Sequence, residues 1–245
     1  MSTRDDIGNR MKRYEQVNTN FLLRRTPVLI RIDGKAFHTW TRHCEQPFDA
    51  NLHNIMRDTM HYLCDNIQNA VYGYTQSDEI SILLCDWLTL NTEQWFDGNI
   101  QKIASVSASL ATGCFNHFVN NHGQLKYNGL AFFDARVFNI PFAEVHNYFL
   151  WRQQDATRNS VQTYARSFFS HKELHKKSCN NIQQMLFEQH DVNWNDLDVW
   201  KKRGSHIYRV PDDVRGGTWV RDTEMSIIDG VFRESGPINT YLKIG

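Results

Sequence analysis

The sequence predicts an α+β fold, and three observations lead to this prediction. Four short runs are rich in β-branched and other apolar residues and are bounded by glycine, proline or a polar turn. Two longer segments between them repeat apolar residues every three or four positions, as amphipathic helices do. The resulting order, β-α-β-β-α-β, is the split pattern of a ferredoxin-like domain.

The first half of the chain contains all six of these elements, preceded by a charged helix. Asp49 suits the N-cap of the first long helix, because its side chain can accept hydrogen bonds from free backbone N–H groups. The expected elements are a charged helix over 4–18, a strand over 27–33, a helix over 48–70, two strands over 71–85 with a turn near 76–78, a helix over 99–120 and a strand over 130–141.

The second half is expected to be largely helical and to end in a β-hairpin. Residues 142–169 predict two helices broken around 155–159, and Ser170 with Glu173 forms a capping box. A short helix over 180–192 follows, and Gly216-Gly217 suits a hairpin turn within the β-rich stretch 204–232. We therefore expect a core with its N-terminal helix over 1–140, and a helical and β part packed on it over 141–245.

Composition narrows the class of protein. The chain has 245 residues, with 27 basic and 27 acidic side chains, so its formal net charge is zero. A generic nucleic-acid coat would be basic overall, although a local basic groove is still open. Five scattered cysteines, a polar N-terminus and the lack of a long apolar run favour a cytoplasmic protein with reduced thiols.

Two places in the sequence set carboxylates at the ends of apolar strands. One strand ends in Asp33-Gly34, and Asp78-Glu79 stands at the turn before another. In a βαββαβ sheet the first and third strands are neighbours, so these carboxylates meet at one edge. Two carboxylates and the Gly34 carbonyl would form an oxygen-only site of the kind that magnesium prefers. The alternative is that both are ordinary solvated turns.

These segments resemble a known family. "RIDGKAFHTWTR", "YGYTQSDEISILL", "FDARVFNIP" and "WRQQDATRNSVQ" together are similar to the tRNA-histidine guanylyltransferase family, and within it to the bacterial and archaeal Thg-like 3′–5′ polymerases. The similarity runs from about Tyr14 to Gly217. It implies a polymerase-type palm that adds nucleotides to the 5′ end of tRNA. ATP or GTP would activate a 5′-monophosphate, two magnesium ions would assist, and a homo-oligomer, dimer or tetramer, would bind the tRNA.

The resemblance also implies roles for individual residues. Asp33, Gly34 and Asp78 would be the metal ligands, and Glu79 belongs to the same catalytic motif. Positions implied to contact the nucleotide or its triphosphate are Arg31, Lys35, Ala36, Phe37, His38, Ser77 and Lys102. Positions implied to contact RNA or phosphate are Arg152, Arg158, Asn159 and Asn193.

One departure refines the expected activity. Family members that add the extra guanosine G−1 to tRNA-His carry a His-Ile-Asn-Asn element, but here the place reads Ala156-Thr157-Arg158-Asn159. This favours template-dependent repair of 5′-truncated tRNA, with G−1 addition as a further activity. A lysine that family members carry after the first motif is also missing here, and Gln46 stands near its place.

Other motifs are weaker, and two other functions stay open. His171 and His175 have the spacing of a zinc pair, but no third ligand suggests itself, so a polar helix face in the basic stretch "HKELHKK" is the better interpretation. Neither a P-loop nor a GxGxxG motif occurs. The alternative functions are a nucleotidyl cyclase-like enzyme on the same palm and a non-catalytic tRNA-binding protein.

Overall fold

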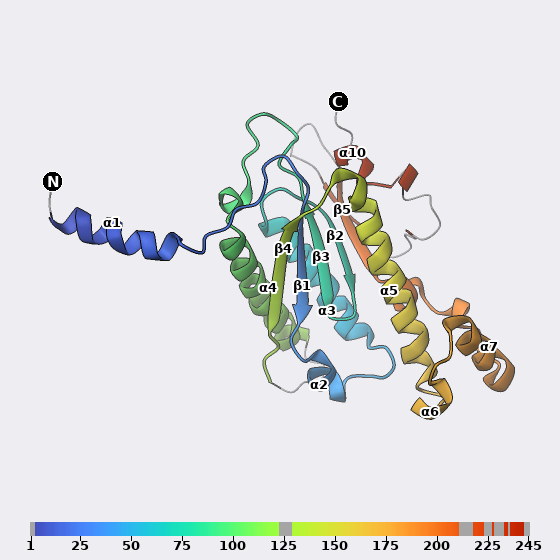
Figure 1. Cartoon of the computed structure of the whole chain (residues 1–245). Coiled ribbons are helices and arrows are strands. Elements are labelled where there is room, and N and C mark those ends of the chain that lie inside the picture. The colour runs from blue at the N-terminus through green and yellow to red at the C-terminus, as the bar shows by residue number, and fades with distance from the viewer. Residues whose placement is uncertain are drawn as a thin grey trace.

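The fold is built on a six-stranded antiparallel sheet with strand order β4-β1-β3-β2-β5-β6 (Figure 1). The computed structural model describes residues 3–122, 129–210, 218–222, 227, 233–234 and 236–242. The strands are β1 (Val28–Gly34), β2 (Ala70–Gln76), β3 (Glu79–Leu84), β4 (Phe133–Asn139), β5 (Ser205–Val210) and β6 (Thr218–Asp222). The order 4-1-3-2 of the first four strands confirms the predicted ferredoxin-like pattern.

Helices connect and cover these strands. The Asp49 side chain caps α3 by accepting from the backbone N–H groups of Asn51 and Leu52, as predicted. The helices are α1 (Thr3–Gln16), α2 (Phe37–Trp40), α3 (Ala50–Asn66), α4 (Ile100–His122), α5 (Val145–Ala165), α6 (His171–Leu174), α7 (Cys179–His190), α8 (Val199–Arg203) and α10 (Asn239–Leu242), with short 3-10 turns at Thr41–His43, Trp95–Gly98, Phe142–Glu144 and Trp194–Asp196.

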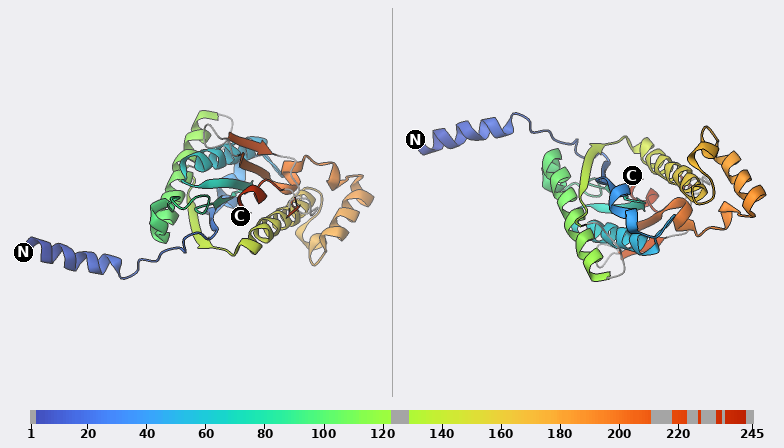
Figure 2. Two further views of the ribbon diagram at one scale, coloured as in Figure 1. Left: turned by 90° about the horizontal axis from the view of Figure 1, so that it is seen from above. Right: turned by 90° about the horizontal axis from the view of Figure 1, so that it is seen from below.

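The two faces of the sheet are covered by different helices (Figures 1 and 2). Because side chains alternate along a strand, Ile30 and Ile32 of β1 join the apolar core under α3 and α4. Leu29 of the same strand instead packs with Phe149 of α5 in a second core. Arg31 and Asp33 share the face of Leu29, so the polar end of β1 faces the side of the sheet that α5 covers.

The structure corrects one predicted break. Helix α5 runs without interruption through 155–159, where the polar sequence suggested two helices. Neither glycine nor proline occurs in α5, Ala156 and Ser160 are buried, and Asp155 pairs with Arg152 and Arg158 one turn away on either side. The polar stretch is therefore one face of a continuous helix and not its end.

The C-terminal part completes the sheet of the first part. The capping box of Ser170 and Glu173 is present at the start of α6, as predicted. Strands β5 and β6 pair with each other, and β5 pairs with β2. The predicted turn at Gly216-Gly217 lies outside the described residues. None of the helices described here is long and apolar enough to cross a membrane.

The first prediction concerns the core under α5. Phe149 is fully buried against Tyr72 and Tyr148. We expect Phe149→Ala to lower the free energy of unfolding by about 3–5 kcal/mol, because it removes buried area and leaves a cavity. Phe187→Ala is the matched control, since Phe187 is 59% exposed on α7, and should change little. Urea unfolding measures both, and equal losses would contradict the assignment of this core.

Candidate active site

Three carboxylates form a row across the end of the sheet. In the strand register Asp33 of β1 lies opposite Glu79 of β3 on one side and opposite Asp134 of β4 on the other. Residues paired in this way share a face of the sheet. We call Asp134, Asp33 and Glu79 the acid row; it stands on the face that α5 covers.

Asp78 adds a fourth carboxylate beside this row. The Gly34 backbone N–H donates to the Asp78 carbonyl at 3.2 Å, which fixes the β2–β3 turn against the end of β1. Burial and then the negative charge of Asp33 raise the pKa of Asp78 to about 6. The two aspartates predicted from sequence to meet are therefore close enough to repel each other.

Glu79 differs from the aspartates because it is buried and paired with two cations. Its Oε2 lies 2.7 Å from Arg31 and 2.9 Å from Arg152, which reaches it from α5. The side chains of Glu79 and Arg152 are only 6% and 4% exposed. Arg152 also stacks on Trp151, with 3.5 Å from its guanidinium carbon to the ring centre. These contacts connect β1, β3 and α5 through one carboxylate.

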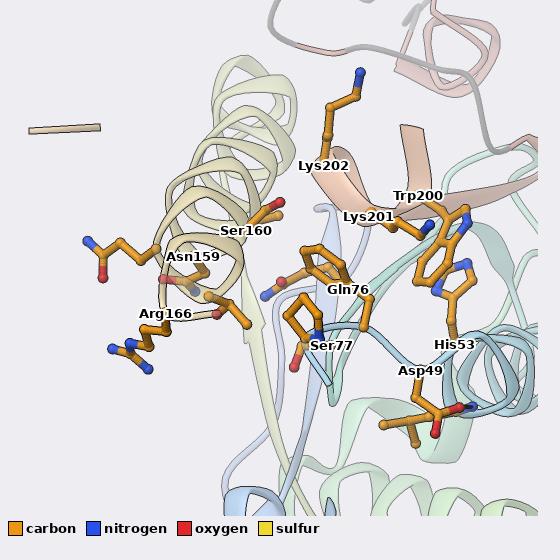
Figure 3. Close-up of a pocket in the computed structure, with 17 residues that line it drawn as sticks. Asp49, His53, Gln76, Ser77, Asn159, Ser160, Arg166, Trp200, Lys201 and Lys202 are labelled. Carbon is orange, nitrogen blue, oxygen red and sulfur yellow. Dashed lines mark hydrogen bonds between the residues drawn. The ribbon is translucent and has the colours of Figure 1, made fainter. Parts of the chain in front are cut away.

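A cavity of about 370 Å³ opens beside the Ser77 turn (Figure 3). In Figure 3 Gln76 and Ser77 lie between Asn159 of α5 and the rings of Trp200 and His53. These two rings stack at 4.4 Å. Burial lowers the pKa of His53 to about 4, so the ring is neutral near pH 7. The lining also contains the cations Arg166, Lys201 and Lys202.

Among the predicted nucleotide residues, those after Gly34 form a tight turn into α2. Ala36 is left-handed with φ of 52°. The Phe37 ring is buried among Trp40, Phe115 and Phe133, so only its backbone could meet a ligand. Lys35 and His38 are exposed. A Cβ on Gly34 would stand 2.2 Å from the Phe37 ring, so no larger residue fits at this position without a shift of the ring.

Lys102 is not brought to this site within one chain. It lies in the first turn of α4, and the neighbouring Ile103 lines a small cavity with Val28 and Leu84. Val28 is the first residue of β1, whereas Asp33 and Gly34 end it. Lys102 therefore stands at the opposite end of the sheet from Asp33 and Asp78. The sequence motif could not show this, because the direction of α4 depends on the fold.

Three residues predicted to contact RNA or phosphate have different surroundings. Asn159 lines the cavity together with Ser77. Arg158 is 61% exposed and pairs with Asp155 on the same helix. The Asn193 side chain caps the turn at Trp194–Asp196 by accepting from the Asn195 N–H, so it is held locally. Their contacts with a ligand stay predictions.

Sequence reasoning missed several residues that border the site. Asp134 and Arg136 of β4 lie opposite Asp33 and Arg31 in the register. Their signal was present in "FDARVF", because antiparallel pairing places alternate residues of that strand beside "RIDG". His53 and Trp200 come from α3 and α8, and no local pattern connects segments so far apart.

The residues at the sheet end fit a divalent cation. Asp33 and Asp78 carry like charges close together, and within the described part of the chain neither has a cation nearer than Arg31, at 3.9 Å from Asp33. The buried Oε1 of Glu79 also has no hydrogen-bond partner among the described residues. Carboxylate oxygens with unbalanced charge are what magnesium binds. No group of three His, Cys, Asp or Glu side chains with metal-site geometry occurs among the described residues, so a backbone carbonyl and substrate oxygens would complete the coordination.

The antiparallel α+β sheet with strand order β4-β1-β3-β2 defines the class: the fold is that of the palm-type nucleotidyltransferases. The family model for tRNAHis guanylyltransferase matches residues 8–141, more than half of the chain. The chain belongs to this family.

Known proteins are similar to this chain over most of its length. A solved bacterial tRNA(His) guanylyltransferase (Thg1)-like protein in complex with ATP has a TM-score of 0.88 and 43% identity, covering 98% of this chain and 100% of that chain. A solved bacterial protein of the same description in complex with GTP has a TM-score of 0.82 and 40% identity, and the match covers 98% of this chain and 100% of that chain. The tRNA(His) guanylyltransferase of Schizosaccharomyces pombe is 28% identical, over 83% of this chain and 80% of the relative.

The second prediction concerns the pairing of Glu79. We expect Glu79→Gln to lower the free energy of unfolding by about 3–5 kcal/mol, because it removes the closer of the two carboxylates that pair with the buried Arg152 and leaves only Asp155, at 3.6 Å. Asp97→Asn is the matched control, since its pair with Arg24 spans 3.7 Å between side chains 80% and 61% exposed. That pair should contribute less than about 1 kcal/mol. Chemical unfolding of both variants tests the difference, and a control loss as large as that of Glu79→Gln would refute it.

Proposed function

We propose that this protein adds nucleotides to the 5′ end of tRNA in the 3′–5′ direction and repairs 5′-truncated tRNA in a template-dependent manner. The observation that supports this most is the coupling of Asp33 and Asp78 at the end of a palm sheet. Such a pair places negative charge where a divalent cation and phosphate oxygens would balance it. Membership of the tRNAHis guanylyltransferase family supports tRNA as the substrate, and the 5′ end is the position that the resemblance of the motifs implies.

Magnesium suits this site. Asp33, Asp78 and the Gly34 carbonyl would hold it, and when bound it would stabilise charge at the reacting phosphate and favour ionisation of the attacking hydroxyl. The chain itself keeps these ligands rigid through the Gly34–Asp78 hydrogen bond. Glu79 and Arg152 act as positioning residues, because their charges neutralise each other inside the protein.

The cavity beside Ser77 suits a nucleotide. The Trp200–His53 pair offers an aromatic surface, the side chains of Asn159 and Gln76 can donate and accept hydrogen bonds, and lysines are close by. The similar bacterial structures hold ATP and GTP. We infer that the 5′-monophosphate reacts here with ATP or GTP and releases pyrophosphate. The 3′-hydroxyl of an incoming nucleoside triphosphate then attacks the activated 5′ phosphate, and the nucleoside monophosphate of the activator leaves. Ser77 and Asn159 are the residues we expect to contact the nucleotide first.

The third prediction tests this activity. The substrate is a tRNA that lacks its first 5′ nucleotide and carries a 5′-monophosphate, incubated with magnesium, ATP and each nucleoside triphosphate in turn. We expect addition only of the nucleotide that pairs with the facing base. Asp33→Asn and Asp78→Asn should each lower the rate by at least about a hundredfold, because each removes a charged ligand of the cation that would stabilise the reacting phosphate.

Asp65→Asn is the matched control for that assay, since Asp65 lies on α3 and is 47% exposed beside His61. It should keep the wild-type rate. Addition of any nucleotide regardless of the facing base would refute templated repair. A wild-type rate of nucleotide addition in the Asp33 and Asp78 variants would refute the proposed active site. Formation of a cyclic nucleotide without tRNA would replace the proposal by a cyclase.

We also propose that the chain forms a homo-oligomer through α1. This helix stands away from the rest of the molecule (Figure 1), and an isolated helix of 14 residues is marginal in water. Its exposed Ile7, Met11 and Tyr14 recur on one face. A groove of about 430 Å³ on α3 and α4, lined by Tyr62 and Phe118 among others, has a largely apolar wall. A second copy of α1 would cover it.

The fourth prediction follows from this interface. The double variant Ile7→Gln, Met11→Gln should run as a monomer, because it removes apolar area from the contact. Lys12→Gln, on the same helix, should keep the wild-type mass. Light scattering after size-exclusion chromatography measures the mass of each, and a monomeric wild-type protein would contradict the proposal.

A further inference from the structure

A second, strongly basic cavity adjoins the candidate active site. It measures about 320 Å³ and lies between α5, α6 and the start of α7; its lining is Gln162, Arg166, His171, Leu174, His175, Lys176, Lys177 and Ile182. We call it the α6 cavity. Gln162 and Arg166 also line the cavity beside Ser77, so the two cavities share part of their lining at the C-terminal end of α5.

The charge of the α6 cavity is all of one sign. Its lining contains three permanent cations, two histidines and no carboxylate. Among the described residues no ion pair forms to Arg166, Lys176 or Lys177, whereas Lys201 in the neighbouring cavity pairs with Asp198 at 2.8 Å. Cations gathered without a countercharge repel one another, so the site favours an anion from outside the chain.

Local structure holds these cations in place. The capping box of Ser170 and Glu173 fixes the start of α6, and the Lys177 N–H donates to the Leu174 carbonyl at 3.1 Å. Lys176 is left-handed with φ of 60°, a conformation that non-glycine residues adopt rarely. Helix α7 begins at Cys179, and its positive end adds to the same field.

The two histidines do not lie on one helix face. Helix α6 ends at Leu174, so His175 leaves the helical spacing that the sequence suggested, and the ring centres are 6.1 Å apart. The part of the chain that the structure describes supplies no third ligand. The histidines are better suited to hydrogen bonds with an oxyanion than to a metal.

We propose that the α6 cavity binds the phosphodiester backbone of the RNA substrate, and this rests on the proposed function. The lining has no Phe, Tyr or Trp ring and its only rings are the two histidines, so it offers a free nucleotide a smaller stacking surface than the cavity beside Ser77, which has Trp200. Arg166 caps the C-terminal end of α5 and follows Asn159 by seven residues, or about 10 Å along the helix. A strand whose 5′ end reacts at Asp33 and Asp78 would cross this stretch of helix within a few nucleotides.

The test is tRNA affinity measured over a series of salt concentrations. The double variant Lys176→Gln, Lys177→Gln should weaken tRNA binding roughly tenfold or more at physiological salt, and should reduce the slope of log K against log salt by about two. Lys172→Gln is the matched control, since Lys172 is on α6 but outside the lining, and should change affinity less than about twofold. GTP affinity should be unchanged in every variant.

Four results separate the possibilities. Wild-type tRNA affinity and salt slope in the double variant would overturn the inference, and so would an equal loss in Lys172→Gln. A matching loss of GTP affinity would assign the cavity to a free nucleotide and also overturn it. Lysine-dependent tRNA binding by a protein that adds no nucleotide would support the inference while refuting the proposed function.

Discussion

The structure depends on one buried carboxylate, Glu79, held between two guanidinium groups. Burying an ion is costly unless its partner is close, and here Arg31 and Arg152 both contact one oxygen. Arg152 lies on α5, so the pair fixes that helix on the sheet. Asn159 follows Arg152 by seven residues, or two turns, and therefore lies on the same side of α5. The ion pair thus determines which residues of α5 reach the Ser77 cavity.

The acid row shows a conflict between stability and function. Asp33 faces Glu79 and Asp134 directly across the sheet, and like charges at paired positions destabilise strands. Slipping β1 by one residue would relieve the repulsion, but it would turn Ile30 and Ile32 out of the core. The apolar residues of β1 therefore hold the carboxylates together. Two guanidinium groups balance Glu79, which leaves the charge of Asp33 and Asp78 for a ligand.

The sequence predicted the fold where local signals were sufficient. The alternation in β1, the Asp49 cap and the Ser170 capping box each depend on residues a few positions apart, and the structure has all three. The expected break in α5 failed because polarity was taken as a helix end, while burial of Ala156 and Ser160 shows a continuous helix. Asp33 and Asp78 could be predicted to meet because the βαββαβ topology brings their strands together. Lys102 and the Trp200–His53 pair depend on helix direction and long-range packing, which no local pattern contains.

Charge is divided between two regions on one side of the sheet. A cluster of carboxylates repels the phosphates of any nucleic acid that approaches, although the proposed reaction requires a 5′ phosphate to come close. The formal net charge of zero offers no general attraction. A cation bound at the carboxylates would remove part of this repulsion, and the basic residues of the α6 cavity, beyond the end of α5, would attract the strand behind its 5′ end. Salt screens each group of charges beyond about 10 Å. Basic residues that attract the strand away from its reacting end therefore do not cancel the negative charge of Asp33 and Asp78, which would bind the cation. A neutral protein can in this way bind a highly charged substrate without spreading basic residues over its whole surface.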